Sequence, residues 1–140
     1  MIEDLIEVRA AEKDELNFVM HSWLRSLRSF EPFYRNMPGE IYFREHGLRA
    51  DAALKRGYCL VVSPRDHPKI ISGYIVWETM VINKEPVTLI HYIYIKEHFR
   101  KMGIASLLIE TINTDRKFIA SARGIAFRDM DYNPYLLDKK

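Results

Sequence analysis

The residues best suited to chemistry lie in one short turn, Arg100 to Ala105, between a strand-like run and an amphipathic helix. At such a turn successive backbone N–H groups point the same way, and the first helical turn leaves its amides unpaired. Together with the helix dipole they form a site suited to an anion such as a pyrophosphate. Gly103 allows close backbone approach, small Ala105 keeps the path clear, and Arg100 and Lys101 add charge at the rim. An ordinary strand-to-helix turn with exposed basic residues fits the pattern equally well.

Other reactive side chains give weaker signals. Cys59 lies in the apolar run GYCLVVS, with no positive neighbour in sequence to lower its pKa, so a buried core residue is favoured over a nucleophile. The five histidines are scattered without a metal-ligand spacing, so no metal site is predicted. One cluster combines aromatic and basic residues, and a packed loop is favoured over base stacking there: Arg28, Phe30, Phe33, Tyr34 and Arg35.

Hydrophobic periodicity predicts the helices that position these residues. The clearest helix runs from Glu12 to Arg28, where Leu16, Val19, Met20, Trp23, Leu24 and Leu27 form one apolar stripe. Ser29 to Pro38 has two prolines and no period, which indicates a shaped loop. A second helix is predicted from Pro38 to Arg56, with Gly57 as a left-handed cap. Behind the turn, a helix is predicted from Met102 to Lys117.

Alternating and apolar runs predict the strands. They are expected at Ile2–Arg9, Tyr58–Ser63, Ile70–Glu78, Val87–Lys96 and Phe118–Ala122. The fourth run, VTLIHYIYIK, is apolar on both faces, as in a central strand covered by helices on both sides. The order β-α-α-β-β-β-α-β, followed by a polar tail, predicts an α/β (α+β) fold with one mixed central sheet flanked by helices.

Length and composition narrow the class of protein. The 140 residues are 48% hydrophobic and 29% charged, which predicts one globular domain over residues 1–140. A net charge of +2 requires no nucleic-acid or membrane partner. Apolar runs are too short to span a bilayer, and the acidic start is unlike an export signal. One cysteine excludes an intramolecular disulfide, so a cytoplasmic setting is expected.

The turn and its flanking elements resemble the GNAT superfamily of N-acetyltransferases. The acyl-CoA motif of that family is matched by Ile95, Arg100, Gly103 and Ala105, and the order of elements agrees from about Ile2 to Phe118. Three short segments further resemble the small GNAT-like proteins of tailed bacteriophages, which would place the chain in the host cytoplasm. These segments are Ser22–Ser26, Ile90–Lys96 and Tyr132–Tyr135.

The resemblance implies that the domain binds acetyl-CoA where the central strand splays away from the next parallel strand. Main-chain groups of Ile93 and Ile95 would hold the pantetheine arm of coenzyme A. The pyrophosphate would bind the amides of Lys101, Met102, Gly103, Ile104 and Ala105.

The resemblance also implies direct transfer of the acyl group to a primary amine, which needs a route for the proton of the ammonium. Candidate bases are Glu78, which a solvated strand-end position would also explain, and His91, which a satisfied core histidine would explain equally well. The family's usual acid is a tyrosine on a helix that this short tail lacks. Tyr135, or less readily Tyr132, is the nearest substitute, and either ring would also serve simply to pack the tail.

Two functions therefore compete. The first is an acetyl-CoA-dependent N-acetyltransferase acting on the amine of a small molecule or protein. The second is a GNAT-shaped binding protein with little turnover that docks on a partner, such as a host protein. The shortened tail favours the second, and neither function needs nucleic acid or a membrane.

Overall fold

The structure is a computed structural model that describes residues 4–112, 117–120 and 131–132. Its helices are η2 (Lys13–Glu15), α1 (Leu16–Phe30), α2 (Pro32–Arg35), α3 (Gly39–Arg56), η3 (Glu97–Phe99) and α4 (Ile104–Thr111), of which η2 and η3 are 3-10 turns. Its strands are β1 (Ile6–Ala10), β2 (Tyr58–Pro64), β3 (Gly73–Ile82), β4 (Glu85–Ile95), β5 (Lys117–Ala120) and β6 (Asp131–Tyr132). None of the described helices combines the length and apolar character needed to span a membrane.

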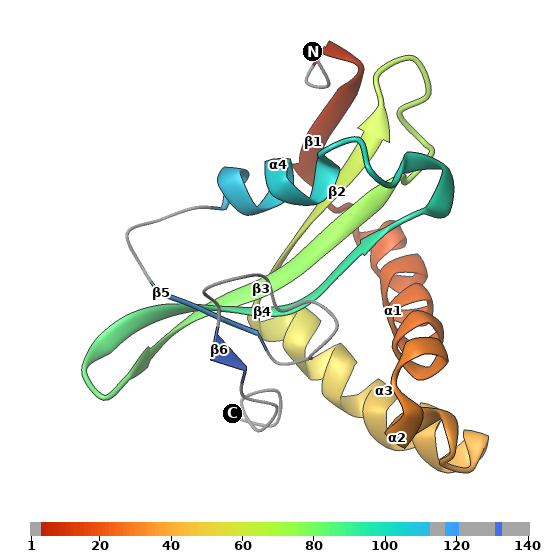
Figure 1. Cartoon of the computed structure of the whole chain (residues 1–140), viewed down its shortest axis with the longest axis vertical. Coiled ribbons are helices and arrows are strands. Elements are labelled where there is room, and N and C mark those ends of the chain that lie inside the picture. Colours follow the sequence, from red (N-terminus) through yellow and green to blue (C-terminus); the bar gives the residue numbers. More distant parts are fainter. Residues whose placement is uncertain (1–3, 113–116, 121–130, 133–140) are drawn as a thin grey trace.

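The strands form one six-stranded sheet in the order β1-β2-β3-β4-β5-β6. Neighbours from β1 to β4 are antiparallel, whereas β4 with β5 and β5 with β6 are parallel. Figure 1 shows α1 and α3 on one side of the sheet and α4 on the other. The predicted mixed sheet flanked by helices is confirmed, and β4 is the covered central strand that its apolar sequence indicated.

The apolar stripe of α1 packs on the sheet as predicted. Val19, Trp23, Leu24 and Leu27 are all buried, four residues that recur on one face of the helix. The helix follows η2, in which Glu12 and Glu15 form a reciprocal capping box. The predicted helix start is therefore a 3-10 turn that leads into α1.

Gly57 ends α3, but not as the predicted left-handed cap. Its φ is −108°, and an added Cβ would lie 2.3 Å from the carbonyl oxygen of Trp77 and 3.1 Å from Cβ of Glu78. The position therefore requires glycine because the helix end approaches β3 closely, and its φ angle makes no such demand.

Several predicted boundaries were wrong. The segment predicted as a loop continues α1 to Phe30 and then forms the short helix α2, because Pro32 suits a first helical turn. β3 begins at Gly73 and runs on to Ile82, four residues past Glu78. The helix expected to reach Lys117 ends at Thr111, and Lys117 already lies in β5. The polar tail contributes β6, which pairs with β5.

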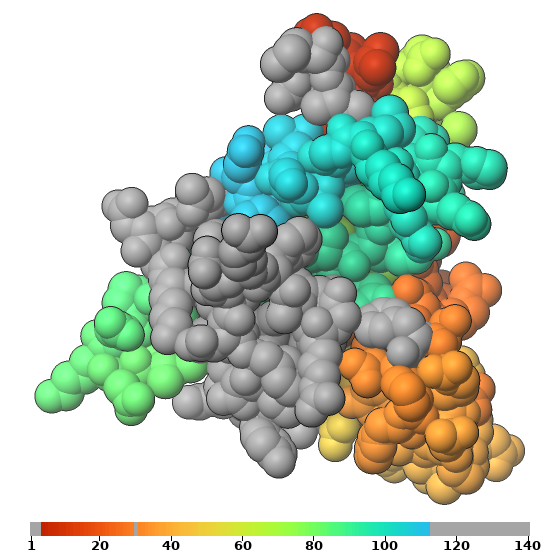
Figure 2. All heavy atoms as spheres, viewed as in Figure 1, coloured from red at the N-terminus to blue at the C-terminus, as the bar shows by residue number. Residues whose placement is uncertain are grey.

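The hairpin between β3 and β4 closes on two residues. Asn83 and Lys84 have φ angles of 51° and 66°, the left-handed values that a tight hairpin turn needs, and they join Ile82 to its partner Glu85. The hairpin projects from the sheet, and in Figure 2 its light green tip stands apart from helices α1 to α3. The prolonged strands place Glu78 and His91 in the interior rather than near a turn.

Candidate active site

β4 changes neighbours along its length. On one side it pairs with β3 throughout, and on the other it pairs with β5 only from Val87 to Ile90. Beyond Ile90 the described part of the chain places no strand on that second side. Where the described residues place no strand beside β4, its edge can pair with an extended ligand through main-chain groups.

A β-bulge marks the start of this edge. Val76 of β3 faces Tyr92, whereas the next residue, Trp77, faces Ile90. His91 is therefore the extra residue on β4, and a bulge re-aims the side chain that it carries. This edge begins where the chain turns this imidazole toward one face of the sheet.

The turn after β4 carries two residues in left-handed conformations, Lys101 at φ 64° and Gly103 at φ 87°. Among the described residues no backbone carbonyl accepts from the amides of residues 101–106, and the first bond of α4 runs from Leu107 N to Gly103 O at 3.0 Å. A Cβ added at Gly103 would meet no atom within 4 Å. The Cβ position of Gly103 is therefore open, and amides without described carbonyl partners lie beside it, as in a backbone anion site.

Arg100 has a structural contact as well as its charge. Its Nε donates to the carbonyl of Ile95 at 2.8 Å, and its guanidinium lies 6.0 Å from the centre of the Tyr94 ring. This contact fixes the end of β4 next to the turn. The side chain remains exposed, as do those of Lys101 and Met102, so the turn carries two exposed basic residues.

Glu78 and His91, predicted separately as candidate bases, lie side by side. Nε2 of His91 is 3.5 Å from one carboxylate oxygen of Glu78, and Nε of Arg56 donates to the other at 3.0 Å. Glu78 and His91 are buried. The alternative of a solvated strand-end charge at Glu78 is therefore wrong, because β3 continues beyond it and α3 covers it.

Electrostatics keep this carboxyl group ionised. Burial alone would raise the pKa of Glu78, but the contacts with His91 and Arg56 outweigh burial and hold the pKa below its usual value. On the helix side, the ring of Trp23 stacks on His91 and Tyr92, with centroids 6.3 and 5.9 Å away. A charged pair and an aromatic ring therefore fix the imidazole from two sides.

Comparison with known proteins agrees with this geometry. The profile of the acetyltransferase (GNAT) family matches residues 20–115, from α1 through the turn and α4. This chain belongs to the GNAT family. The match covers the edge of β4 after Ile90, the amide turn and the Glu78–His91 pair.

Solved structures share the GNAT fold at low sequence identity. A proposed acetyltransferase from Pyrococcus furiosus superposes with a TM-score of 0.64 at 14% identity, covering 76% of this chain and 70% of that one. A Corynebacterium glutamicum structure described as histone acetyltransferase HPA2 and related acetyltransferase gives 0.58 at 12%, covering 76% and 69%. A proposed acetyltransferase from Clostridium difficile 630 gives 0.56 at 14%, covering 83% and 78%. No curated protein matches significantly.

Three further candidate residues of the GNAT site are Cys59, Tyr135 and Tyr132, and the structure describes the side chain of Cys59 only. Cys59 is half-buried against the core, and burial raises the pKa of its thiol to about 12, so a thiolate is scarce at neutral pH. Tyr135 lies outside the described residues, and for Tyr132 the description covers the backbone of β6 only. Tyr135 and Tyr132 therefore stay predictions.

The aromatic and basic cluster packs the α1–α2–α3 junction of this GNAT chain. Arg28 donates to the carbonyl oxygens of Tyr34 and Met37 at 3.3 and 2.9 Å, and Tyr34 packs against Tyr42 and His46. The packed interpretation is confirmed for these described side chains. Phe33 and Arg35 of the cluster are exposed.

Sequence reasoning missed Arg56. Its side chain, a quarter exposed, reaches Glu78 from the last residue of α3. The available signal was Gly57, because a glycine after a helix indicates a close approach to another element as well as a cap. If Gly57 is taken as a sign of close approach, the preceding residue, Arg56, is expected to lie against a neighbouring element.

Proposed function

We propose that this GNAT protein transfers an acetyl group from acetyl-CoA directly to the primary amine of a small molecule or a protein. The observation that carries the proposal is that the described residues place no strand beside β4 after Ile90, where β4 runs into a turn whose amides meet no described backbone carbonyl. The edge of β4 would hold an extended ligand, the turn after it would bind an anion, and the candidate base His91 lies on the same strand. The reaction would proceed in the cytoplasm, where acetyl-CoA is available, and in the host cytoplasm if the chain is encoded by a phage.

The residues of the edge and the turn fit a coenzyme A group. Main-chain groups of Ile93 and Ile95 would pair with its amide-containing arm, and the amides of residues 101–105 would bind its pyrophosphate. The open space above Gly103 leaves room for the phosphates. Arg100 contributes charge, while the backbone amides carry most of the contact.

When bound, acetyl-CoA supplies a thioester whose acyl carbon accepts the amine nitrogen. The chain's own residues orient the amine and take its proton, for which the Glu78–His91 pair is the candidate. The raised pKa of Cys59 supports direct transfer without an acyl-enzyme. Tyr135 stays the candidate that returns a proton to the departing sulfur.

Release of free thiol tests the proposal directly. Acetyl-CoA is incubated with the protein and a panel containing a polyamine, an aminoglycoside and a lysine peptide, and acceptor-dependent thiol is measured. We expect release with at least one acceptor class, unchanged within a few-fold in Cys59→Ala and reduced about 100-fold in Tyr135→Phe. Absence of acceptor-dependent release across a broad panel, despite acetyl-CoA binding, would favour a different function.

That second function is a GNAT-shaped protein that binds a partner with little turnover, such as a host protein. It is favoured by apolar side chains that stay exposed on α2 and α3, namely Phe33, Ile41, Phe43 and Leu48. Polar substitution of Phe33 and Leu48 separates the two functions. An enzyme with a small acceptor keeps its turnover, whereas a binding protein loses partner capture.

A further inference from the structure

Helix α3 buries one face and exposes a regular stripe along the opposite face. The buried residues are Tyr42, His46, Ala50 and Ala53. Residues that alternate at spacings of three and four positions lie on one line along a helix. On the exposed face this line, which we call the outer stripe, consists of Ile41, Arg44, Leu48, Asp51 and Lys55. Ile41 and Leu48 are 43% and 66% exposed, so the stripe presents two apolar side chains to its surroundings.

The charged residues of the outer stripe form ion pairs within α3 and stay accessible. Nζ of Lys55 lies 2.9 Å from Oδ2 of Asp51, and Nε of Arg44 lies 3.2 Å from Oε1 of Glu45. These four side chains are 48% to 77% exposed. Exposed ion pairs contribute little to stability, and each group keeps further hydrogen-bonding capacity. A second partner can therefore bind them without breaking a buried contact.

The order of charges along the outer stripe complements itself in one orientation only. A parallel two-fold pair of helices would place each residue beside its own copy, so that like charges meet at Arg44 and at Asp51. An antiparallel pair centred near Leu48 places Arg44 beside Asp51 of the second copy, because these residues lie at nearly equal distances on either side of the centre. Glu40, next to the start of the stripe, meets Lys55 of the second copy in the same way.

The apolar residues of the outer stripe fit the same antiparallel arrangement. Leu48 lies next to its own copy across the two-fold axis, and Ile41 lies on the aliphatic stem of Lys55 from the second copy. Apolar contact at the centre with opposite charges on either side is typical of a specific helix pair. Phe33 and Phe43, which are also exposed, lie outside the stripe.

We infer that the outer stripe of α3 binds the outer stripe of a second copy of this chain, with the two helices antiparallel. From Ile41 to Lys55 the stripe is about 21 Å long, at the usual helical rise. A contact of this length is small for a specific interface, so the dimer is reversible. In Figure 1 α3 and α4 lie on opposite sides of the sheet, so the dimer leaves the turn at Gly103 open. The inference does not depend on the proposed acetyl transfer.

Two charge reversals test this arrangement. Arg44→Asp places a negative charge opposite Asp51 of the second copy, and Asp51→Arg places a positive charge opposite Arg44. Each variant alone should self-associate at least about tenfold more weakly than the wild type. An equimolar mixture of the two variants has opposite charges at both positions again and should associate within a few-fold of the wild type. A change in the fold of either variant would not produce this recovery.

Analytical ultracentrifugation from micromolar to millimolar concentration measures the association, and circular dichroism shows whether each variant is folded. Leu48→Ser removes the apolar contact at the centre and should also weaken the dimer. Arg25→Asp is the matched control, because it reverses an exposed charge of α1, outside the outer stripe. This control should leave the association constant unchanged.

A wild type that stays monomeric at millimolar concentration would overturn the inference and leave the outer stripe to a partner of another kind. A dimer that persists in both folded charge variants, or a mixture that does not associate, would overturn it as well. If either variant does not fold, Glu40→Lys and Lys55→Glu repeat the test at the other charge pair. These measurements contain no acetyl-CoA, so their result is separate from that of the proposed transfer.

Discussion

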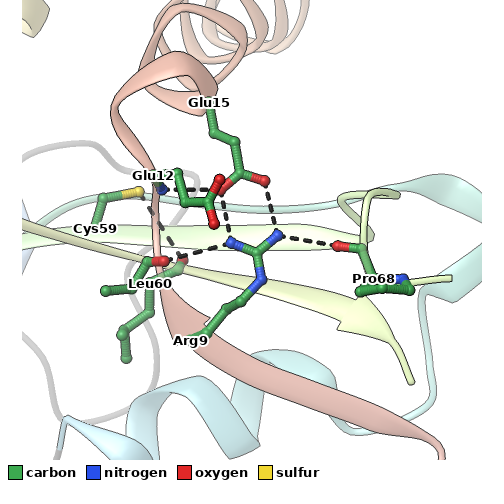
Figure 3. A network of polar contacts seen from close by, with 7 residues as sticks. Arg9, Glu12, Glu15, Cys59, Leu60 and Pro68 are labelled. Atoms are coloured by element: carbon green, nitrogen blue, oxygen red, sulfur yellow. Dashed lines mark hydrogen bonds and ion pairs between the residues drawn. The ribbon is translucent and has the colours of Figure 1, made fainter. Parts of the chain in front are cut away.

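Two arginine–glutamate pairs in this protein consist of the same groups but have different neighbours. Arg9 binds both oxygens of Glu15, at 2.6 and 2.7 Å, and also the carbonyls of Pro68 and Ala10 (Figure 3). Glu15 in turn accepts from the amide of Glu12 at 2.9 Å. In the other contact, Arg56 makes one 3.0 Å bond to Glu78, whose second oxygen faces His91.

The difference lies in the third partner. Around Arg9 the further partners are backbone groups, so the network ties β1, η2 and the loop before β3 together and has no group that changes charge near neutral pH. Around Glu78 the further partner is an imidazole, the side chain suited to exchanging a proton there. A network completed by the main chain stabilises the fold, and we propose that the one ending on histidine serves proton transfer.

The largest expected effect is on turnover, and it belongs to the histidine network alone. His91→Gln should lower kcat by about 10²- to 10⁴-fold if the proposed Glu78–His91 pair takes the amine proton. Glu15→Gln should leave kcat within a few-fold, since Arg9 and Glu15 do not contact the site. Initial rates at saturating acetyl-CoA measure both. Equal losses in the two variants would abolish the distinction between the networks.

Gly57→Ala should have the next largest effect, on stability. The added Cβ would lie 2.3 Å from a backbone oxygen of β3, so α3 must lift from the sheet at a cost of about 2–3 kcal/mol. Gly47→Ala is the matched control, because its Cβ would meet only Leu24 at 3.7 Å. That control should stabilise α3 by about 0.5–1 kcal/mol. Urea unfolding of both variants provides the comparison.

Glu15→Gln should lower the free energy of unfolding by about 1–2 kcal/mol at pH 7. The hydrogen bonds from Arg9 outweigh burial and hold the pKa of Glu15 below its usual value near 4.5. The folded state therefore gains stability above that pH and loses it as the pH falls. Melting curves from pH 7 to 3 should show the wild type approaching the variant. A gap that stays constant over this range would contradict an ionic origin.

The smallest effect is expected at the hairpin, remote from both networks. Lys84→Gly relieves a left-handed φ of 66° and should raise stability by about 0.5 kcal/mol, with unchanged turnover. Thermal melting measures the gain. A loss of activity in this variant would show that distant changes in stability also move the rate, which would weaken the conclusions drawn from His91.

The sequence predicted the local features of the site and missed its tertiary pairing. The strand, the turn at Gly103 and the following helix depend on periodicity and glycine, which are readable locally. Strict alternation along β4 places His91 and Tyr92 on opposite faces, yet both stack on Trp23. The bulge that causes this, and the position where α3 crosses β3 at Arg56, depend on packing between distant segments. The contacts of Arg56 and His91 with Glu78 could therefore not be predicted from the sequence.

The most direct test of the central claim is a calorimetric titration with acetyl-CoA. Gly103→Asn keeps a residue that tolerates φ 87° but places a side chain in the open space of the turn. Lys101→Gly is its control, since it relieves a left-handed residue without adding atoms. We predict saturable binding by the wild type and by Lys101→Gly, with at least tenfold weaker binding by a folded Gly103→Asn. No heat from the wild type at millimolar acetyl-CoA, or equal affinity in all three proteins, would contradict an acyl-CoA site at this turn.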